Sequence, residues 1–121
     1  MAATIGLCAA TVLAGCERTQ AVALTAEDFR FTPDLVRVNA STPITLTVYN
    51  AGREIHEFDS PVLIYAPATN LPQNTKPSGA SGVLLAPGQS LRLVMAPPPG
   101  TYLYNCRRKG HTNMSGTLIV E

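Results

Sequence analysis

The carboxyl-terminal part of the sequence brings a thiol, an imidazole and a thioether into nine consecutive residues. They belong to Cys106, His111 and Met114, in the run CRRKGHTNM. The chain holds only two histidines, and the other one, His56, lies 50 positions before Cys106. Thiolate is a soft metal donor, imidazole is borderline, and thioether is a weak soft donor. These residue types therefore point to a metal site.

The mixture of donors discriminates between metals. Structural zinc sites use four cysteines, or cysteines together with histidines, and a single Cys with two His and a Met does not match them. Two His and one Cys with a weak axial Met form the donor set of blue-copper electron-transfer sites. Each residue alone has an ordinary role as a buried thiol, a surface imidazole or a core thioether. The copper interpretation rests on their combination.

Length and composition restrict the class of protein. The chain has 121 residues, which is the length of one domain. A net charge of +1 with 14% charged residues excludes an electrostatically driven nucleic-acid binder, and 45% hydrophobic residues exclude a disordered chain. Ten Pro, nine Gly and no Trp are typical of a β-rich domain with many turns.

Short alternating or apolar runs recur along the chain and are separated by turns rich in Pro and Gly. The predicted strands cover residues 21–25, 35–38, 44–49, 62–65, 83–85, 91–95, 102–104 and 117–120. Such spacing predicts an all-β sandwich of two antiparallel sheets with about eight strands. Residues 66–82 break this rhythm with three Pro and two Gly. They form either a partner-docking loop or a tolerated insertion.

The amino-terminal residues have the character of an export signal. Residues 1–14 are uncharged and apolar, yet too few to span a bilayer, which takes about 20. The motif Leu13-Ala14-Gly15-Cys16 then precedes a polar run and resembles the lipobox of bacterial lipoproteins. No Lys or Arg precedes the apolar stretch, so Met1 need not be the native start. The alternative is an ordinary buried strand or helix over residues 1–16.

The lipobox resemblance implies a signal peptide over residues 1–15 and a mature domain over residues 16–121. Cys16 would carry the lipid, and Cys8 would leave with the signal peptide. We then expect an exported protein, periplasmic or on the cell surface, anchored by lipid to a bacterial membrane. Cys106 would be the one remaining thiol. In an oxidising compartment such a cysteine is buried, reactive or bound to a metal.

The mature chain resembles the cupredoxins, small copper proteins such as plastocyanin, azurin and amicyanin. The matching elements are FRFTP at residues 29–33, NAG at 50–52 followed by His56, PGTYLYNC ending at Cys106, and then His111, Met114 and Gly116. The resemblance implies an eight-stranded Greek-key sandwich with one type 1 copper, which alternates between Cu(I) and Cu(II). It also implies that His56, Cys106 and His111 are equatorial ligands, Met114 is axial, and His111 is the ligand at the solvent edge.

Two features depart from the family pattern. Four residues separate Cys106 from His111, as in azurin, whereas two separate His111 from Met114, as in amicyanin. The distance of the axial thioether is therefore open. Glu57 stands where several members carry Asn. We expect its carboxylate to bond the Thr112 hydroxyl or to pair with Arg107, and so to orient the site.

These features favour one-electron transfer between redox partners outside the cytoplasm. The alternatives are a copper chaperone, storage or resistance protein, and an interaction module without a metal. We expect no enzyme, because nothing supplies an oxyanion site beside Cys106 and His111, and the acidic pairs at 27–28 and 57–59 show no cleft pattern. Arg107, Arg108 and Lys109 either steer a redox partner with an acidic surface, such as a cytochrome or an oxidase, or form a solvated charged loop without partner preference. We expect a monomer that binds no nucleic acid.

Overall fold

Alternation of buried and exposed side chains along the strands indicates sheets with one face covered. It is clearest in the strand Ser90–Met95, where every second residue is buried. The computed structural model describes residues 18–67, 82–108, 110–111 and 113–121. Nine strands occur in this part of the chain: β1 (Gln20–Glu27), β2 (Arg30–Thr32), β3 (Leu35–Val38), β4 (Ile44–Asn50), β5 (His56–Phe58), β6 (Val83–Leu85), β7 (Ser90–Met95), β8 (Gly100–Asn105) and β9 (Ser115–Val120).

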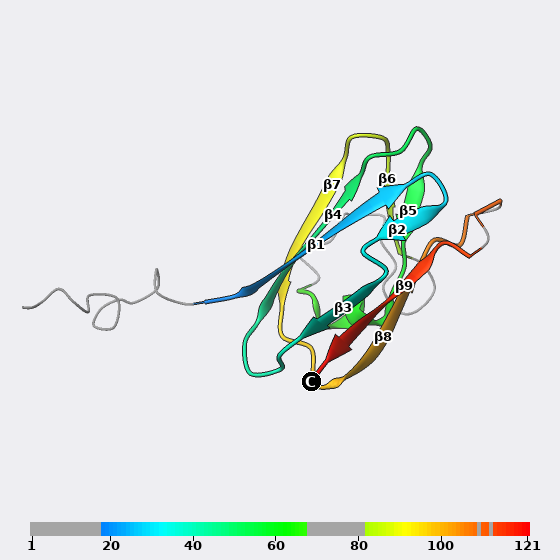
Figure 1. The fold of residues 1–121 in the computed structure, drawn as a ribbon. Helices are drawn as coiled ribbons and strands as arrows, with labels where there is room; N and C mark the ends of the chain where they lie inside the picture. The colour runs from blue at the N-terminus through cyan, green and yellow to red at the C-terminus, as the bar shows by residue number, and fades with distance from the viewer. Residues whose placement is uncertain (1–17, 68–81, 109, 112) are drawn as a thin grey trace, which may run out of the picture.

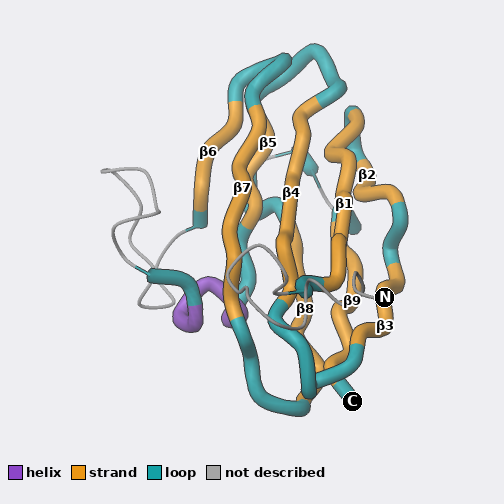
Figure 2. The backbone as a smooth tube through the Cα atoms, turned by 90° about the vertical axis from the view of Figure 1, so that its left-hand side faces the viewer, coloured by secondary structure: helices purple, strands orange, loops and turns teal. Residues whose placement is uncertain are grey.

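The strands form the two layers of a sandwich and one small additional pair (Figure 1). The first layer has the order β2-β1-β4-β7, the second has the order β3-β9-β8, and β5 pairs with β6. Strands β1 and β4 are parallel, because the chain leaves the first layer to form β3 and then returns. Figure 2 shows β7, β4 and β1 side by side in one layer, with β8 and β9 behind them. The predicted all-β sandwich is confirmed, but the prediction of antiparallel sheets is wrong, because β1 pairs with β4 and β3 pairs with β9 in parallel. The described residues form nine strands, one more than predicted.

The strand prediction differs from the structure in three places. Residues 62–65 were predicted as a strand, which is wrong, because Pro61–Tyr65 forms a 3-10 helix. The Oγ of Ser60 accepts a hydrogen bond from the backbone N–H of Val62, and Pro61 occupies the first helical position. Strands β2 and β5 were not predicted, because three residues each are too few to show alternation.

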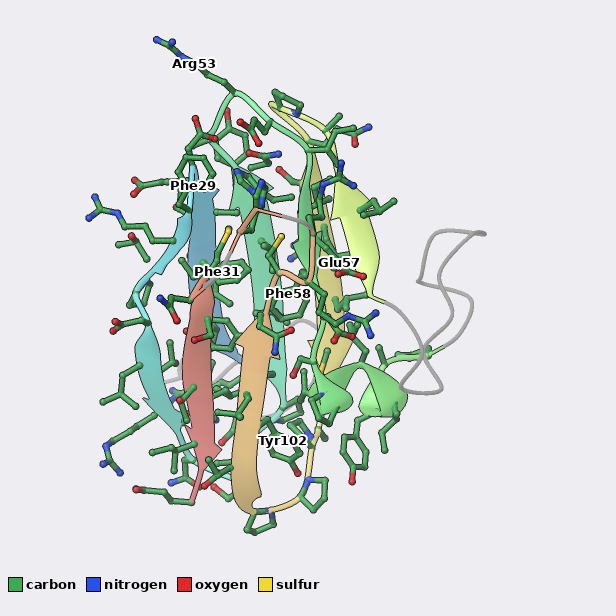
Figure 3. The ribbon with its side chains drawn as sticks, turned by 90° about the vertical axis from the view of Figure 1, so that its right-hand side faces the viewer. Phe29, Phe31, Arg53, Glu57, Phe58 and Tyr102 are labelled. Atoms are coloured by element: carbon green, nitrogen blue, oxygen red, sulfur yellow. The ribbon has the colours of Figure 1, made fainter. Side chains whose placement is uncertain are left out.

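The core between the layers is apolar, and an aromatic cluster forms the end nearest the candidate metal centre. Phe31 meets Phe58 and Tyr104 edge to face, with ring centroids 6.2 and 5.3 Å apart. The hydroxyl of Tyr104 donates to the carbonyl of Pro33 at 2.8 Å, and burial raises the pKa of Tyr104 to about 12. Gly116 lies flat against this ring, where any Cβ would overlap it. Figure 3 shows Phe31 and Phe58 inside the sandwich.

Several sequence predictions fall on residues that the structure does not describe. They are the signal peptide, the lipidation of Cys16, most of the segment 66–82, and the roles of Lys109 and Thr112. They stay predictions. Among the described residues, there is no helix with the length and apolar character needed to cross a membrane.

Candidate metal centre

Two of the predicted ligands stand at neighbouring strand ends. His56 is the first residue of β5, and Cys106 follows the last residue of β8. Asp59 and Asn105 exchange two backbone hydrogen bonds of 2.9 Å each, and these join the two strand ends. Side chains two positions apart along a strand share a face. These two hydrogen bonds therefore bring together two segments that are distant in the sequence. His56 stands two positions before Phe58 in one segment, and Cys106 stands two positions after Tyr104 in the other.

The loop after β8 brings the third ligand to the same place. The N–H of His111 donates to the carbonyl of Arg108 at 3.0 Å, and this turn directs the loop back toward β5. The Nδ1 of His111 then lies 3.2 Å from the Sγ of Cys106 and 3.3 Å from the Nδ1 of His56. All three side chains are buried, and one ligand atom from each lies within 4.8 Å of the others. The structure thus assembles the three residues that the sequence singled out as equatorial ligands.

The donor atoms fit a single metal ion. Two nitrogen donors about 2 Å from one ion stand about 3.3 Å apart at a tetrahedral angle. Two imidazole nitrogens and a thiolate are donors that copper accepts in either of its common oxidation states. Burial of three such polar groups beside one another is unfavourable unless a cation or hydrogen bonds compensate for it. The His–Cys–His cluster is therefore suited to one copper ion.

Met114 lies beside Cys106 and His111. Its carbonyl accepts a hydrogen bond from the N–H of Cys106 at 3.0 Å, and its own N–H donates to the carbonyl of His111 at 3.3 Å. The side chain is 1% exposed. Met114, Cys106 and His111 line the same surface hollow of about 430 Å³. This placement suits an axial thioether, and the ligand role of Met114 stays a prediction.

Glu57 connects three segments around the thiol. One of its carboxylate oxygens accepts from the backbone N–H of Arg107 at 3.1 Å, and the other accepts from the backbone N–H of Gly82 at 3.0 Å. The Arg107 guanidinium adds an ion pair at 3.2 Å. The structure thus shows the Arg107 partner that the sequence suggested for Glu57, whereas Thr112 lies outside the described residues.

The environment of Glu57 stabilises its ionised form. Burial of this carboxyl opposes ionisation, but the bonds from Arg107 and Gly82 outweigh it and hold the pKa of Glu57 below its usual value. The backbone N–H of Glu57 also donates to the Sγ of Cys106 at 3.3 Å. This hydrogen bond helps to fix the position of the sulfur. Glu57 therefore acts on the site through both its backbone and its side chain.

Three residues that contact the histidines were not predicted from the sequence. The Nε2 of His56 lies 3.1 Å from the Oδ1 of Asp28, and the Nε2 of His111 lies 3.0 Å from the Oε1 of Glu54. The ring of Phe29 meets the His111 ring edge to face, with centroids 5.3 Å apart. His111 is consequently only 5% exposed, so its ring is more covered than a solvent-edge ligand implies. No spacing in the sequence signals these contacts, because they join residues 28 to 82 positions apart.

Replacement of Glu57 by Gln tests its contribution. The variant removes a charge that Arg107 compensates, and we expect the free energy of unfolding to fall by about 1–3 kcal/mol. Loss of negative charge beside the thiolate disfavours Cu(II), so the reduction potential should rise and Cu(II) affinity should fall. Thermal unfolding, voltammetry and competition with a chelator measure these effects.

Glu27→Gln is the matched control, since Glu27 pairs with Arg30 at 2.7 Å at the surface. An unchanged potential together with an unchanged copper affinity in Glu57→Gln would contradict the role assigned to Glu57.

Comparison with known proteins identifies the family. The sequence matches the family described as a cupredoxin-like domain over residues 1–120. No curated protein matches it. Among solved structures, auracyanin B is 24% identical, with 84% of this chain and 88% of that chain covered and a TM-score of 0.62. Auracyanin A of Chloroflexus aurantiacus, described as a "blue" copper protein, is 21% identical, with 86% and 100% covered and a TM-score of 0.60.

A larger protein shares the same fold. A multicopper oxidase is 20% identical, with 92% of this chain but 45% of that chain covered and a TM-score of 0.57. At these identities the structural likenesses establish the fold, and the family match adds the sequence relationship. Because that match spans nearly the whole sequence, the chain belongs to the cupredoxin-like domain family.

Proposed function

We propose that this protein is a type 1 copper protein that carries single electrons between redox partners. The observation that carries the proposal is the buried convergence of two imidazole Nδ1 atoms and one thiol Sγ at distances of 3.2 and 3.3 Å. When bound, copper would supply a one-electron Cu(I)/Cu(II) couple. The description of auracyanin A as a "blue" copper protein supports the same chemistry.

The surrounding protein favours a site that changes little between oxidation states. Cys106 is held by its backbone bond to Met114 and by the N–H of Glu57. Each histidine is held at its outer nitrogen by a carboxylate. Ligands fixed in this way need little rearrangement when an electron arrives or leaves. Such rigidity suits an electron carrier better than a chaperone, which must release its metal.

The same arrangement favours a carrier over an enzyme. The three ligands are buried, and Phe29 and Glu54 cover His111. An electron passes through such a covering, whereas a substrate needs an open coordination position. The multicopper oxidase that shares the fold is about twice as long as this chain, which covers 45% of it. We therefore propose electron transfer without catalysis.

Addition of Cu(II) to the purified protein tests this proposal. We expect an intense visible band from thiolate-to-copper charge transfer and a reversible one-electron wave. Cys106→Ser should abolish the band, because the thiolate is then absent. A colourless, tight Cu(I) complex without a redox wave would instead indicate a chaperone or storage protein. Absence of copper binding would indicate an interaction module.

The two buried methionines among the described residues provide a matched test of the axial ligand. Met114→Leu should keep the visible band but raise the reduction potential, because loss of a thioether donor destabilises Cu(II) more than Cu(I). Met95→Leu, in β7, removes a thioether that is also buried but lies on the strand distant from the ligand loop. Voltammetry should show no shift for it. Equal potentials in both variants would contradict an axial role for Met114.

We also propose that the redox partner has an acidic surface. The basic area of this protein that would face it is smaller than the sequence suggests. Arg107 forms ion pairs with Glu57 at 3.2 Å and Asp59 at 3.0 Å, so nearby carboxylates compensate its charge. Arg108 is exposed at the same loop and supports the proposal. Oxidation of the Cu(I) form by the anion hexacyanoferrate(III) should slow several-fold in Arg108→Gln and on addition of salt. Arg92→Gln, on β7, serves as control, and equal rates in the two variants would contradict steering.

A further inference from the structure

Each histidine of the metal centre is paired with a carboxylate on its outer side. Asp28 contacts the Nε2 of His56 at 3.1 Å, and Glu54 contacts the Nε2 of His111 at 3.0 Å. The two Nδ1 atoms point inward and lie 3.3 Å apart. The site therefore has the same carboxylate–imidazole arrangement twice, built from three segments: the turn after β1, the segment that contains Glu54 and His56, and the loop after β8.

The carboxylates determine which ring nitrogen carries the proton. An ionised carboxylate only accepts hydrogen bonds, so the nitrogen that it contacts must be the N–H donor. A neutral ring in such a contact carries its proton on Nε2 and keeps a lone pair on Nδ1. Two lone pairs at 3.3 Å, next to the Sγ of Cys106, repel each other until a cation lies between them. The carboxylates thus hold the centre ready for a metal.

The backbone around Asp28 holds its carboxylate against the Nε2 of His56. Asp28 also accepts a hydrogen bond from the N–H of Arg53 at 2.9 Å, which joins the β1–β2 turn to the β4–β5 loop. Gly52 lies so close that a Cβ there would overlap both Asp28 Oδ1 and His56 Nε2. Phe29, the next residue of the turn, adopts φ 76° and places its ring against His111. This short turn therefore contacts both histidines, and Figure 3 shows Phe29 and Arg53 at the same end of the molecule.

The loop that carries Glu54 is also fixed. The side chain of Asn50 is fully buried, and its Nδ2 donates to the carbonyl of Glu54 and to the carbonyl of Leu85, both at 2.8 Å. Its Oδ1 accepts from the N–H of Gly52, also at 2.8 Å. The backbone of Glu54 is therefore linked through the Asn50 side chain to β6, which pairs with the strand of His56. Its contact with His111 is thus supported by an ordered loop.

We propose that Asp28 and Glu54 are positioning residues that set both imidazoles in the Nε2–H form before metal binds and then favour Cu(II) over Cu(I). The first half concerns the protein without metal, and the second half rests on the proposed function. A carboxylate on the outer nitrogen raises the basicity of the inner one. Greater basicity stabilises the more highly charged ion more strongly. Asp28 should have the larger effect, because its side chain is 31% exposed against 54% for Glu54.

Nitrogen NMR of the metal-free protein tests the first half. In the unaltered protein at mildly alkaline pH, the ring nitrogen shifts should show one tautomer for each histidine, with the proton on Nε2. Asp28→Ala should convert His56 to a mixture of tautomers and leave His111 unchanged, and Glu54→Ala should do the reverse. Glu27→Ala, beside Asp28 but paired with Arg30, should change neither. Rings that keep the Nε2–H form in both test variants would overturn the proposal.

Isosteric variants test the second half. Asp28→Asn and Glu54→Gln keep the shape but remove the charge, and we expect Cu(II) affinity to fall up to about tenfold with a smaller change for Cu(I). A tenfold difference between the two ions corresponds to a rise in potential of about 59 mV. Glu27→Gln should leave the potential unchanged. Equal Cu(II) and Cu(I) losses, or no loss, would overturn the preference for Cu(II).

The two readouts separate this inference from the proposed function. If the unaltered protein bound no copper, electron transfer would be wrong, while the tautomers of the metal-free protein would still test the positioning role. If copper bound with the expected band but the tautomers ignored Asp28 and Glu54, the inference would fail and the proposed function would stand.

Discussion

The metal centre depends on one pair of backbone hydrogen bonds, those between Asp59 and Asn105. They join the end of β5 to the end of β8 and bring together residues that lie 50 positions apart in the sequence, His56 and Cys106. The same register places the N–H of Glu57 on the Sγ of Cys106 and the Glu57 carboxylate on Arg107. A shift of one residue would turn these side chains to the opposite face. The aromatic packing of Phe58 and Tyr104 beneath the ligands stabilises this register.

Many of the strands and the metal ligands could be predicted from the sequence. The alternation of apolar and polar side chains indicated the strands, and the donor types of the side chains indicated the ligands. The strands at 35–38, 44–49 and 91–95 alternate strongly, and each lies within an observed strand. Their half-buried faces leave little freedom in how they pack. The donor types of His56, Cys106 and His111 predicted a metal cluster, and the structure brings these residues together. The pairing of Glu57 with Arg107 was also foreseeable. Each of these residues directly follows a ligand in the sequence, and ligands of one metal ion must lie close to one another.

The remaining features depend on local backbone geometry and on contacts between distant segments. The run at 62–65 has the apolar character of a buried strand, but Ser60 and Pro61 begin a 3-10 helix there. Asp28 and Glu54 are ordinary acidic residues in sequence, and the acidic pair at 27–28 showed no sign of a role. Their function depends on a turn with positive φ at Phe29 and on close approach at Gly52. Such contacts become visible only when the loops are placed in three dimensions.

We propose that His56, Cys106 and His111 form one preorganised copper site, with both imidazoles bound through Nδ1. A crystal structure of the copper-loaded protein tests this claim most directly. We expect one copper ion bonded to both Nδ1 atoms and to Sγ, with Asp28 and Glu54 still in contact with the two Nε2 atoms. Copper bonded through Nε2 of either ring, or without Cys106, would contradict it.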